Sequence, residues 1–162
     1  MNYLKASIFI FIALALTRFI PHPPNFTSLI ALSFYIPIIL GLKFLPALFL
    51  SYIITDVFIG LHSVTFFTWG SVIFIGLISR NFTNSLLKRI LGAQVGVLFF
   101  YLITNFGVWS LGSYGYNLSG LVNCYIMAIP FLGNTIISTL LYSSVIEIFF
   151  IKKSLLKKSI LN

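Results

Sequence analysis

Long apolar runs with almost no charged side chains limit this chain to a small set of folds. Of its 162 residues, 59% are hydrophobic and 7% are charged, and the acidic residues are only Asp56 and Glu147. A soluble domain carries roughly 25% charged residues, so this composition is not that of a water-soluble protein. In lipid, the backbone must satisfy its own hydrogen bonds as helices or as a closed barrel. The runs are far longer than the ~10-residue alternating strands of a barrel, so we predict an all-α integral membrane protein.

A membrane-spanning helix needs about 20 residues, with a range of roughly 17–25. With this length as a guide, the apolar runs predict a six-helix transmembrane bundle that forms one domain over residues 1–162. A turn-rich loop at 110–120 follows the fifth span, and Pro130 is expected to separate a short tucked helix from the sixth span. The predicted spans are about 3–19, 26–42, 44–61, 64–79, 87–109 and 131–151.

The distribution of lysine and arginine predicts the orientation of this bundle. If the N-terminus is cytoplasmic, nine of the ten basic residues fall on the cytoplasmic side and only Arg18 lies outside. Such asymmetry in short loops sets membrane orientation, so we expect both termini in the cytoplasm of a bacterial cell, with the chain in its inner membrane. A cleaved signal peptide is the alternative for residues 1–15, because Lys5, an apolar stretch and Ala13–Ala15 fit that pattern.

Several classes of partner and site are not expected. The net charge of +8 comes from residues at the ends of apolar runs and not from a basic stripe on a soluble element, so no nucleic acid partner is predicted. The single cysteine, Cys124, cannot form an internal disulfide or a Cys-x-x-Cys site. No paired carboxylates or hydrolase motifs occur, so we predict no catalytic residues, no cofactor and no metal. Because there is no Walker loop, ATP-driven work would need another protein.

Polar and aromatic residues gather at the predicted outer end of the bundle. Three prolines between residues 21 and 24 restrict the first outer loop, since proline fixes φ and makes the preceding residue extended. A stiff loop lowers the entropy cost of binding a ligand, so we expect it to act as a lid. The polar and aromatic residues expected at this end include Arg18, His22, Asn25, His62 and Tyr116.

Polar residues also lie within the predicted spans. Asp56 is an ionisable residue inside a span, which costs at least ~2.5 kcal/mol and indicates a functional residue, although neutralisation of Arg18 is a structural alternative. Glu147 is expected to be an interfacial charge near the lysines that follow it. Two stripes at helical spacing are expected to face one another, either around a ligand or in interhelical hydrogen bonds. They are Gln94, Tyr101, Asn105 and Trp109 on span five, and Asn134, Ser138 and Tyr142 on span six.

Four stretches between residues 17 and 144 resemble a family of small uncharacterised bacterial membrane proteins with the signature R-x-x-P-H-P-P-N-F-T. They are TRFIPHPPNFTSLIAL, LSYIITDVFIGLHS, FTWGSVIFIGLISR and TNFGVWSLGSYGYNLSGLVNCYIMAIPFLGNTIISTLLYS. In architecture and size, that family is similar to the substrate-capture (S) subunits of energy-coupling-factor vitamin transporters. The resemblance implies six helices, a binding cavity roofed by outer loops, and docking on a transmembrane coupling subunit with ATPases.

These observations predict a substrate-binding membrane subunit for uptake of a small vitamin-like or cofactor-precursor molecule, working with a separate energising module. The alternatives are a non-transport membrane scaffold or assembly factor, and an intramembrane metal-dependent enzyme built on the two histidines. The expected partners are the small-molecule ligand, the lipid bilayer and the coupling subunit. The predicted binding residues are Arg18, His22, Asn25, Asp56, His62, Trp69, Asn105, Trp109, Tyr116, Cys124, Tyr125 and Asn134.

Overall fold

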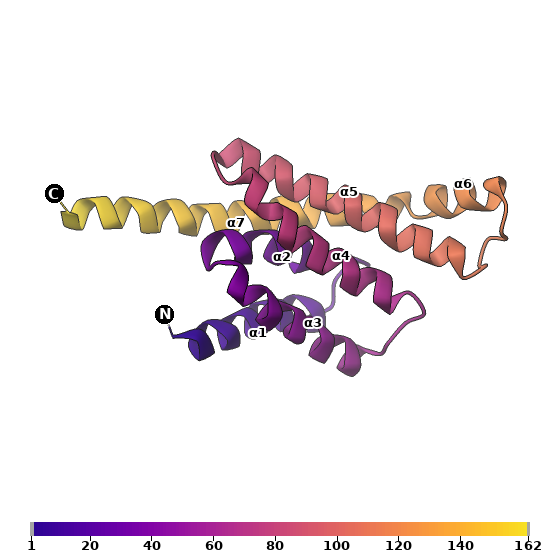
Figure 1. Ribbon diagram of the computed structural model, residues 1–162, viewed down its shortest axis with the longest axis horizontal. Coiled ribbons are helices and arrows are strands. Elements are labelled where there is room, and N and C mark those ends of the chain that lie inside the picture. Colours follow the sequence, from indigo (N-terminus) through magenta and orange to yellow (C-terminus); the bar gives the residue numbers. More distant parts are fainter. Residues whose placement is uncertain (1, 162) are drawn as a thin grey trace.

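The computed structural model describes the backbone of residues 2–161 and the side chains of residues 2–149 (Figure 1). All regular secondary structure in this part of the chain is helical, as the sequence predicted. The α-helices are α1 (Tyr3–Phe19), α2 (Leu29–Ile39), α3 (Leu45–Ile59), α4 (Thr65–Ile78), α5 (Leu86–Ser110), α6 (Leu118–Met127) and α7 (Ile129–Leu161), and two short 3-10 helices are η1 (Leu42–Phe44) and η2 (Ser79–Phe82).

Three helical segments are both long and apolar enough to cross a membrane, which indicates a membrane protein. They are Leu42–Ile59, Leu86–Ser110 and Ile129–Phe149. The remaining predicted spans contain α1, α2 and α4, which have 17, 11 and 14 residues. In particular, α2 has 11 residues where about 17 were predicted, because a turn at Pro23–Phe26 delays its start and Gly41 at φ 95° ends it. Glycine adopts such a positive φ without strain.

Helices α1 to α5 run in alternating directions, and α6 and α7 return together, so both ends of the chain lie at one end of the molecule (Figure 1). We call this the terminal end. The connections at residues 20–28, 60–64 and 111–117 lie at the opposite end, which we call the loop end. The short helix α6 follows the last of these connections and is separated from α7 at Ala128, next to Pro130. A short helix before the last span was predicted from this proline.

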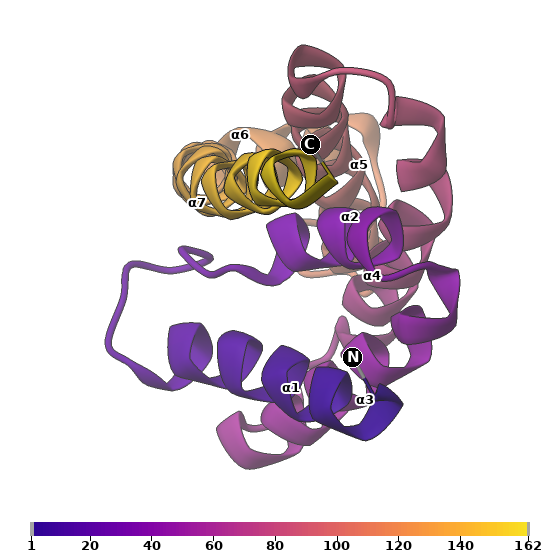
Figure 2. The same cartoon turned by 90° about the vertical axis from the view of Figure 1, so that its left-hand side faces the viewer.

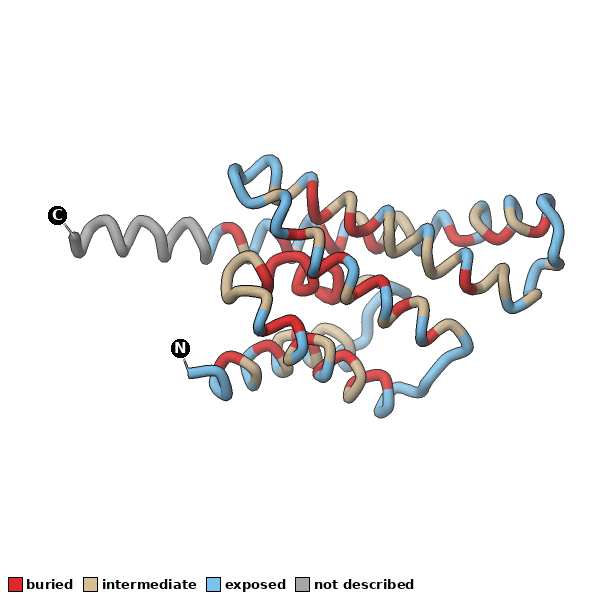
Figure 3. The backbone as a smooth tube through the Cα atoms, in the orientation of Figure 1, coloured by how far each residue is buried: buried red, intermediate tan, exposed pale blue. Residues whose placement is uncertain are grey.

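Helix α2 lies in the centre of the fold. Nine of its 11 residues, Leu29–Pro37, are buried, and Figure 2 shows α2 between α1 and α7. A helix that is apolar all round belongs in a protein interior. The buried residues form two clusters, one shared with α1, α3 and α4, and the other shared with α4 and α5, with partly buried residues of α7 packed against it. Figure 3 shows this buried centre along α2, surrounded by helices with one exposed side.

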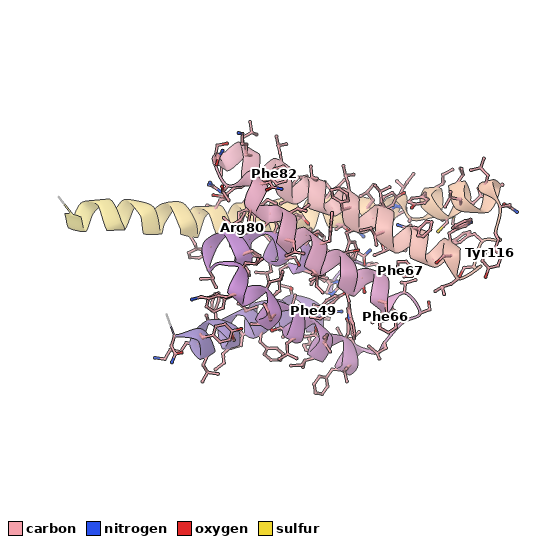
Figure 4. The ribbon with its side chains drawn as sticks, in the orientation of Figure 1. Phe49, Phe66, Phe67, Arg80, Phe82 and Tyr116 are labelled. Atoms are coloured by element: carbon pink, nitrogen blue, oxygen red, sulfur yellow. The ribbon has the colours of Figure 1, made fainter. Side chains whose placement is uncertain are left out.

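Two glycines of α5 allow close packing within the chain. Gly92 and Gly96 form a Gly-x-x-x-Gly pair, a spacing that lets two helices approach closely. Both glycines lie against side chains of the same chain. A Cβ atom on Gly92 would lie 2.5 Å from the Phe82 ring and 2.6 Å from the Phe34 ring, and one on Gly96 would lie 3.1 Å from Ile75. Phe82 is visible beside the first turns of α5 in Figure 4.

We predict that Gly92→Ala destabilises the protein, whereas Gly70→Ala leaves its stability unchanged or higher. The first substitution forces the buried Phe34 ring and the partly buried Phe82 ring to move, and such overpacking costs about 1–3 kcal/mol. A Cβ atom on Gly70 would have no neighbour within 4 Å, so alanine there adds only the roughly 1 kcal/mol helix preference over glycine. Thermal unfolding in detergent measures both. A Gly92→Ala melting temperature at or above that of Gly70→Ala would contradict the packing.

Candidate ligand-binding cavity at the loop end

Two adjoining cavities open at the loop end of the bundle. Their volumes are about 340 Å³ and about 260 Å³. Small-molecule sites occupy roughly 300–1,000 Å³, so the pair could enclose a ligand of vitamin size. They adjoin because five residues line both of them. These shared residues are Asn25, His62, Thr68, Phe100 and Thr135.

The cavity walls combine hydrogen-bonding groups with flat aromatic rings. Asn105 and Tyr101 of α5 line the larger cavity, and Arg18 and His22 line the smaller one. No acidic side chain is found among the described lining residues of either cavity. A ligand would therefore meet amides, hydroxyls, imidazoles and one guanidinium group, together with apolar surface from Phe100. Such walls can orient a polar molecule through hydrogen bonds and also contact a flat ring.

The loop at residues 20–28 is held over the smaller cavity by contacts at both of its ends. The hydroxyls of Thr17 and Ser28 hydrogen-bond to each other at 2.8 Å, which joins the end of α1 to the start of α2. On the other side, Asn134 Nδ2 of α7 donates to the Pro24 carbonyl oxygen at 3.0 Å. Asn25 has a φ of 62°, and among the described residues that are not glycine it alone has a positive φ. Asparagine tolerates this left-handed conformation better than most residues, and it places Asn25 over both cavities.

A buried ion pair lies beside the smaller cavity and joins three helices. Arg18 Nη2 of α1 donates to Asp56 Oδ1 of α3 at 2.6 Å. The other carboxylate oxygen, Oδ2, accepts from Trp69 Nε1 of α4 at 2.7 Å. Arg18 Nη1 donates to Thr55 Oγ1 at 2.6 Å, and its guanidinium group lies over the Tyr52 ring. Each oxygen of Asp56 thus has a partner within the protein, as a buried carboxylate requires.

The structure brings half of the twelve predicted binding residues to the cavity walls. Tyr125 instead donates its hydroxyl to the Leu102 carbonyl oxygen, and Trp109 Nε1 donates to the Asn117 carbonyl oxygen. Tyr116 is 74% exposed at the far tip of the loop end (Figure 4). The residues on the walls are Arg18, His22, Asn25, His62, Asn105 and Cys124, and those away from them are Asp56, Trp69, Trp109, Tyr116, Tyr125 and Asn134.

Three of the five residues that line both cavities were absent from the predicted set. Thr68, Phe100 and Thr135 line both cavities. A signal for Thr135 was present in the sequence, because it begins a second series of polar residues on α7, one position after the predicted series at Asn134. For Phe100 there was no such signal, since phenylalanine is common throughout the chain and only packing selects which ring faces a cavity.

Glu147 differs from its predicted place at the membrane interface. Its side chain is 3% exposed, and both carboxylate oxygens accept from Arg89 of α5, at 2.6 Å from Nε and 2.7 Å from Nη2. The lysines that suggested an interfacial position lie beyond Phe149, outside the residues whose side chains are described. A bidentate contact with arginine allows the carboxylate to be buried, because it replaces two hydrogen bonds to water.

The thiol of Cys124 is buried against the backbone of α5. Cys124 is 2% exposed and its Sγ lies 3.4 Å from the Asn105 carbonyl oxygen. Burial raises the pKa of the Cys124 thiol, which keeps it protonated and unreactive at neutral pH. Within the described residues, no group of three or more histidine, cysteine, aspartate or glutamate side chains is placed to hold a metal ion.

The fold and the cavity together define a helical membrane protein with a small-molecule-sized cavity at one end. The chain belongs to a family of unknown function, DUF6580, whose family model matches residues 2–160. Comparisons with curated proteins and with solved structures found no match. Membership agrees with the predicted place in an uncharacterised family, and the geometry of the site is therefore the basis for any functional conclusion.

We predict that Asp56→Leu destabilises the protein and that adding Arg18→Met restores much of the loss. Removing one partner of a buried ion pair leaves an uncompensated charge, which costs about 3–5 kcal/mol, whereas an apolar replacement of both partners is often close to neutral. Thermal unfolding in detergent compares the two variants with the unaltered protein. If the double variant is no more stable than Asp56→Leu alone, the ion pair does not have the structural role inferred from its contacts.

Proposed function

We propose that this chain is the substrate-binding membrane subunit of an uptake system, and that it captures a small vitamin-like or cofactor-precursor molecule at the loop end. The observation that supports this most directly is the pair of adjoining cavities under a loop tied to α1, α2 and α7. Preorganised polar groups bind a ligand with a smaller loss of entropy than mobile ones do. A separate energising module, as in the S-subunit resemblance, belongs to the same proposal.

In the proposed orientation, the loop end faces outward and the chain crosses a bacterial inner membrane six times with both termini in the cytoplasm. The short length of α2 is compatible with six crossings, because this helix is enclosed by protein and need not match the lipid thickness. Basic residues support the orientation, since Arg18 lies near the loop end and is neutralised by Asp56. The others before residue 150 are Lys5, Lys43, Arg80, Lys88 and Arg89, which lie toward the terminal end.

The charges of the cavity walls indicate what kind of ligand is favoured. The charge of Arg18 is balanced by Asp56, and His22 and His62 are the remaining groups on the described walls that can become cationic. A cationic ligand would find no carboxylate to accept it on these walls, because both oxygens of the neighbouring Asp56 are already used within the protein. The walls therefore favour a neutral or anionic molecule with hydrogen-bonding groups and a flat apolar part that contacts Phe100 or Tyr101.

Asn105 offers the sharpest test of this proposal. Its Nδ2 donates to the Tyr101 carbonyl oxygen at 2.8 Å, which orients the amide and leaves Oδ1 to accept from a ligand. We predict that Asn105→Leu, which keeps a similar shape, lowers the amount of copurifying small molecule at least tenfold. Asn123→Leu is the matched control, because Asn123 is exposed on α6 and lines neither cavity.

Mass spectrometry of small molecules released from the purified proteins measures this effect, with thermal unfolding as the check on folding. The proposal requires a molecule that is present in the unaltered protein and in Asn123→Leu but is depleted in Asn105→Leu. Equal amounts in all three proteins would place the ligand elsewhere. A loss of stability in Asn105→Leu with no molecule bound to any of the proteins would favour a scaffold or assembly factor instead.

A further inference from the structure

A buried polar face runs along α7 from the loop-end cavities toward the terminal end. Thr135, Thr139, Ser143 and Glu147 follow one another at intervals of four residues, so successive members are about 40° apart and the series winds through about 120° around the helix. Their exposed fractions are 5%, 0%, 0% and 2%. Thr135 lines both cavities, and Glu147 pairs with Arg89 near the other end. The face therefore connects the cavities with the second ion pair.

Two hydroxyls in the middle of this face form no well-aligned hydrogen bond to a described residue. They are Thr139 Oγ1 and Ser143 Oγ. Elsewhere on the same helix, Thr135 donates to the Phe131 carbonyl oxygen and Ser138 donates to the Thr135 carbonyl oxygen. Serine and threonine inside helices commonly satisfy their hydroxyls in this way. Thr139 and Ser143 forgo this option, so their hydroxyls require a partner from outside their own helix.

The helices packed against α7 add further unpartnered groups at the same depth. On α5, neither Nε2 nor Oε1 of Gln94 has a partner within the described chain, although both atoms are buried. Arg89 contacts Glu147 at one level and Phe100 shares a cavity wall with Thr135 at another, so Gln94 lies between them, level with residues 139–143. On α2, the Tyr35 hydroxyl lies beside Ser143 and Glu147, yet it forms no well-aligned hydrogen bond to a described residue.

These four side chains contribute five unpartnered atoms at a similar depth along the bundle. Each buried polar group without a partner costs about 1–3 kcal/mol, and native proteins leave few of them. Buried water commonly satisfies such groups, with about three hydrogen bonds per molecule. A metal cation is a poorer candidate, because Glu147 supplies the one carboxylate among the described residues of this region and the adjacent Arg89 guanidinium would repel the ion. Water matches the mixture of donors and acceptors.

We propose that Tyr35, Gln94, Thr139 and Ser143 bind a file of ordered water that extends the loop-end cavities inward as far as the Arg89–Glu147 pair. The file gives the interior between α2, α5 and α7 a water-accessible polar route along the axis of the bundle. The proposed water file goes beyond ligand capture at the loop end, because it forms part of a path across the membrane inside this chain.

Silver ions test the route, because Ag⁺ is close to water in size, reacts with thiols and does not enter dry apolar protein. In a Cys124→Ala background, single cysteines are introduced as Thr139→Cys and Ser143→Cys. The matched control is Ala93→Cys, since Ala93 is 0% exposed in the apolar cluster next to Gln94. After exposure to Ag⁺, the remaining thiols are counted by maleimide labelling of the denatured protein.

We expect Thr139→Cys and Ser143→Cys to react with Ag⁺ at least tenfold faster than Ala93→Cys. Reaction of all three at the same slow rate would overturn the proposal. The readout uses no ligand, so loss of the loop-end binding function would leave it unchanged, and failure of either idea can be recognised separately.

A second measurement decides the question if a cysteine variant does not fold. Thr139→Val removes the hydroxyl but keeps the shape of the side chain. If the hydroxyl binds water, the valine variant loses that bond and melts at a lower temperature than the unaltered protein. If the region is dry, removal of an unsatisfied hydroxyl raises the melting temperature and overturns the proposal. Ser138→Ala is the control, because Ser138 is equally buried but bonded within its own helix.

Discussion

The enclosure of α2 by other helices sets the arrangement of everything around it. A helix with apolar residues on every side must be covered on every side, and the two clusters of buried residues on its flanks do this. One cluster packs α1, α3 and α4 against α2, and the other packs α4 and α5 against it, with α7 beside them. Leu29 and Ile30 at the start of α2 line the smaller cavity, together with residues of the surrounding helices.

The two acidic residues of the chain strengthen opposite ends of this arrangement. Asp56 joins α3 to Arg18 of α1 and Trp69 of α4 near the loop end, and Glu147 joins α7 to Arg89 of α5 toward the terminal end. In a low-dielectric interior, an isolated charge would cost far more than a paired one. Both carboxylates therefore hold helices together, and the described cavity walls carry amides, hydroxyls, imidazoles, aromatic rings and the Arg18 guanidinium group.

The difference between local sequence patterns and packing between helices explains where sequence-based prediction succeeded and where it did not. The bounds of α1 agree with the predicted ones, and α5 differs by one residue at each end, because apolar runs ending in charged or turn-forming residues mark helix termini directly. The polar series on α7 was predicted at Asn134, Ser138 and Tyr142, whereas the fully buried series begins at Thr135. Both series have helical spacing, and a difference of one residue, about 100° around the helix, depends on which neighbour packs against it.

Composition and local conformational limits were enough to predict that this chain is helical and suited to a membrane, and the structure agrees with both. A proline-rich lid over one polar and aromatic end stays a prediction. The packing of the helices was needed to establish that Asn105 faces a cavity while Asp56 faces an arginine, and that Thr139 and Ser143 face an interior region without protein partners among the described residues. Periodicity identifies the residues that share one side of a helix. Whether that side meets a ligand, a charge, lipid or water depends on where the other helices lie, and no local pattern contains that information.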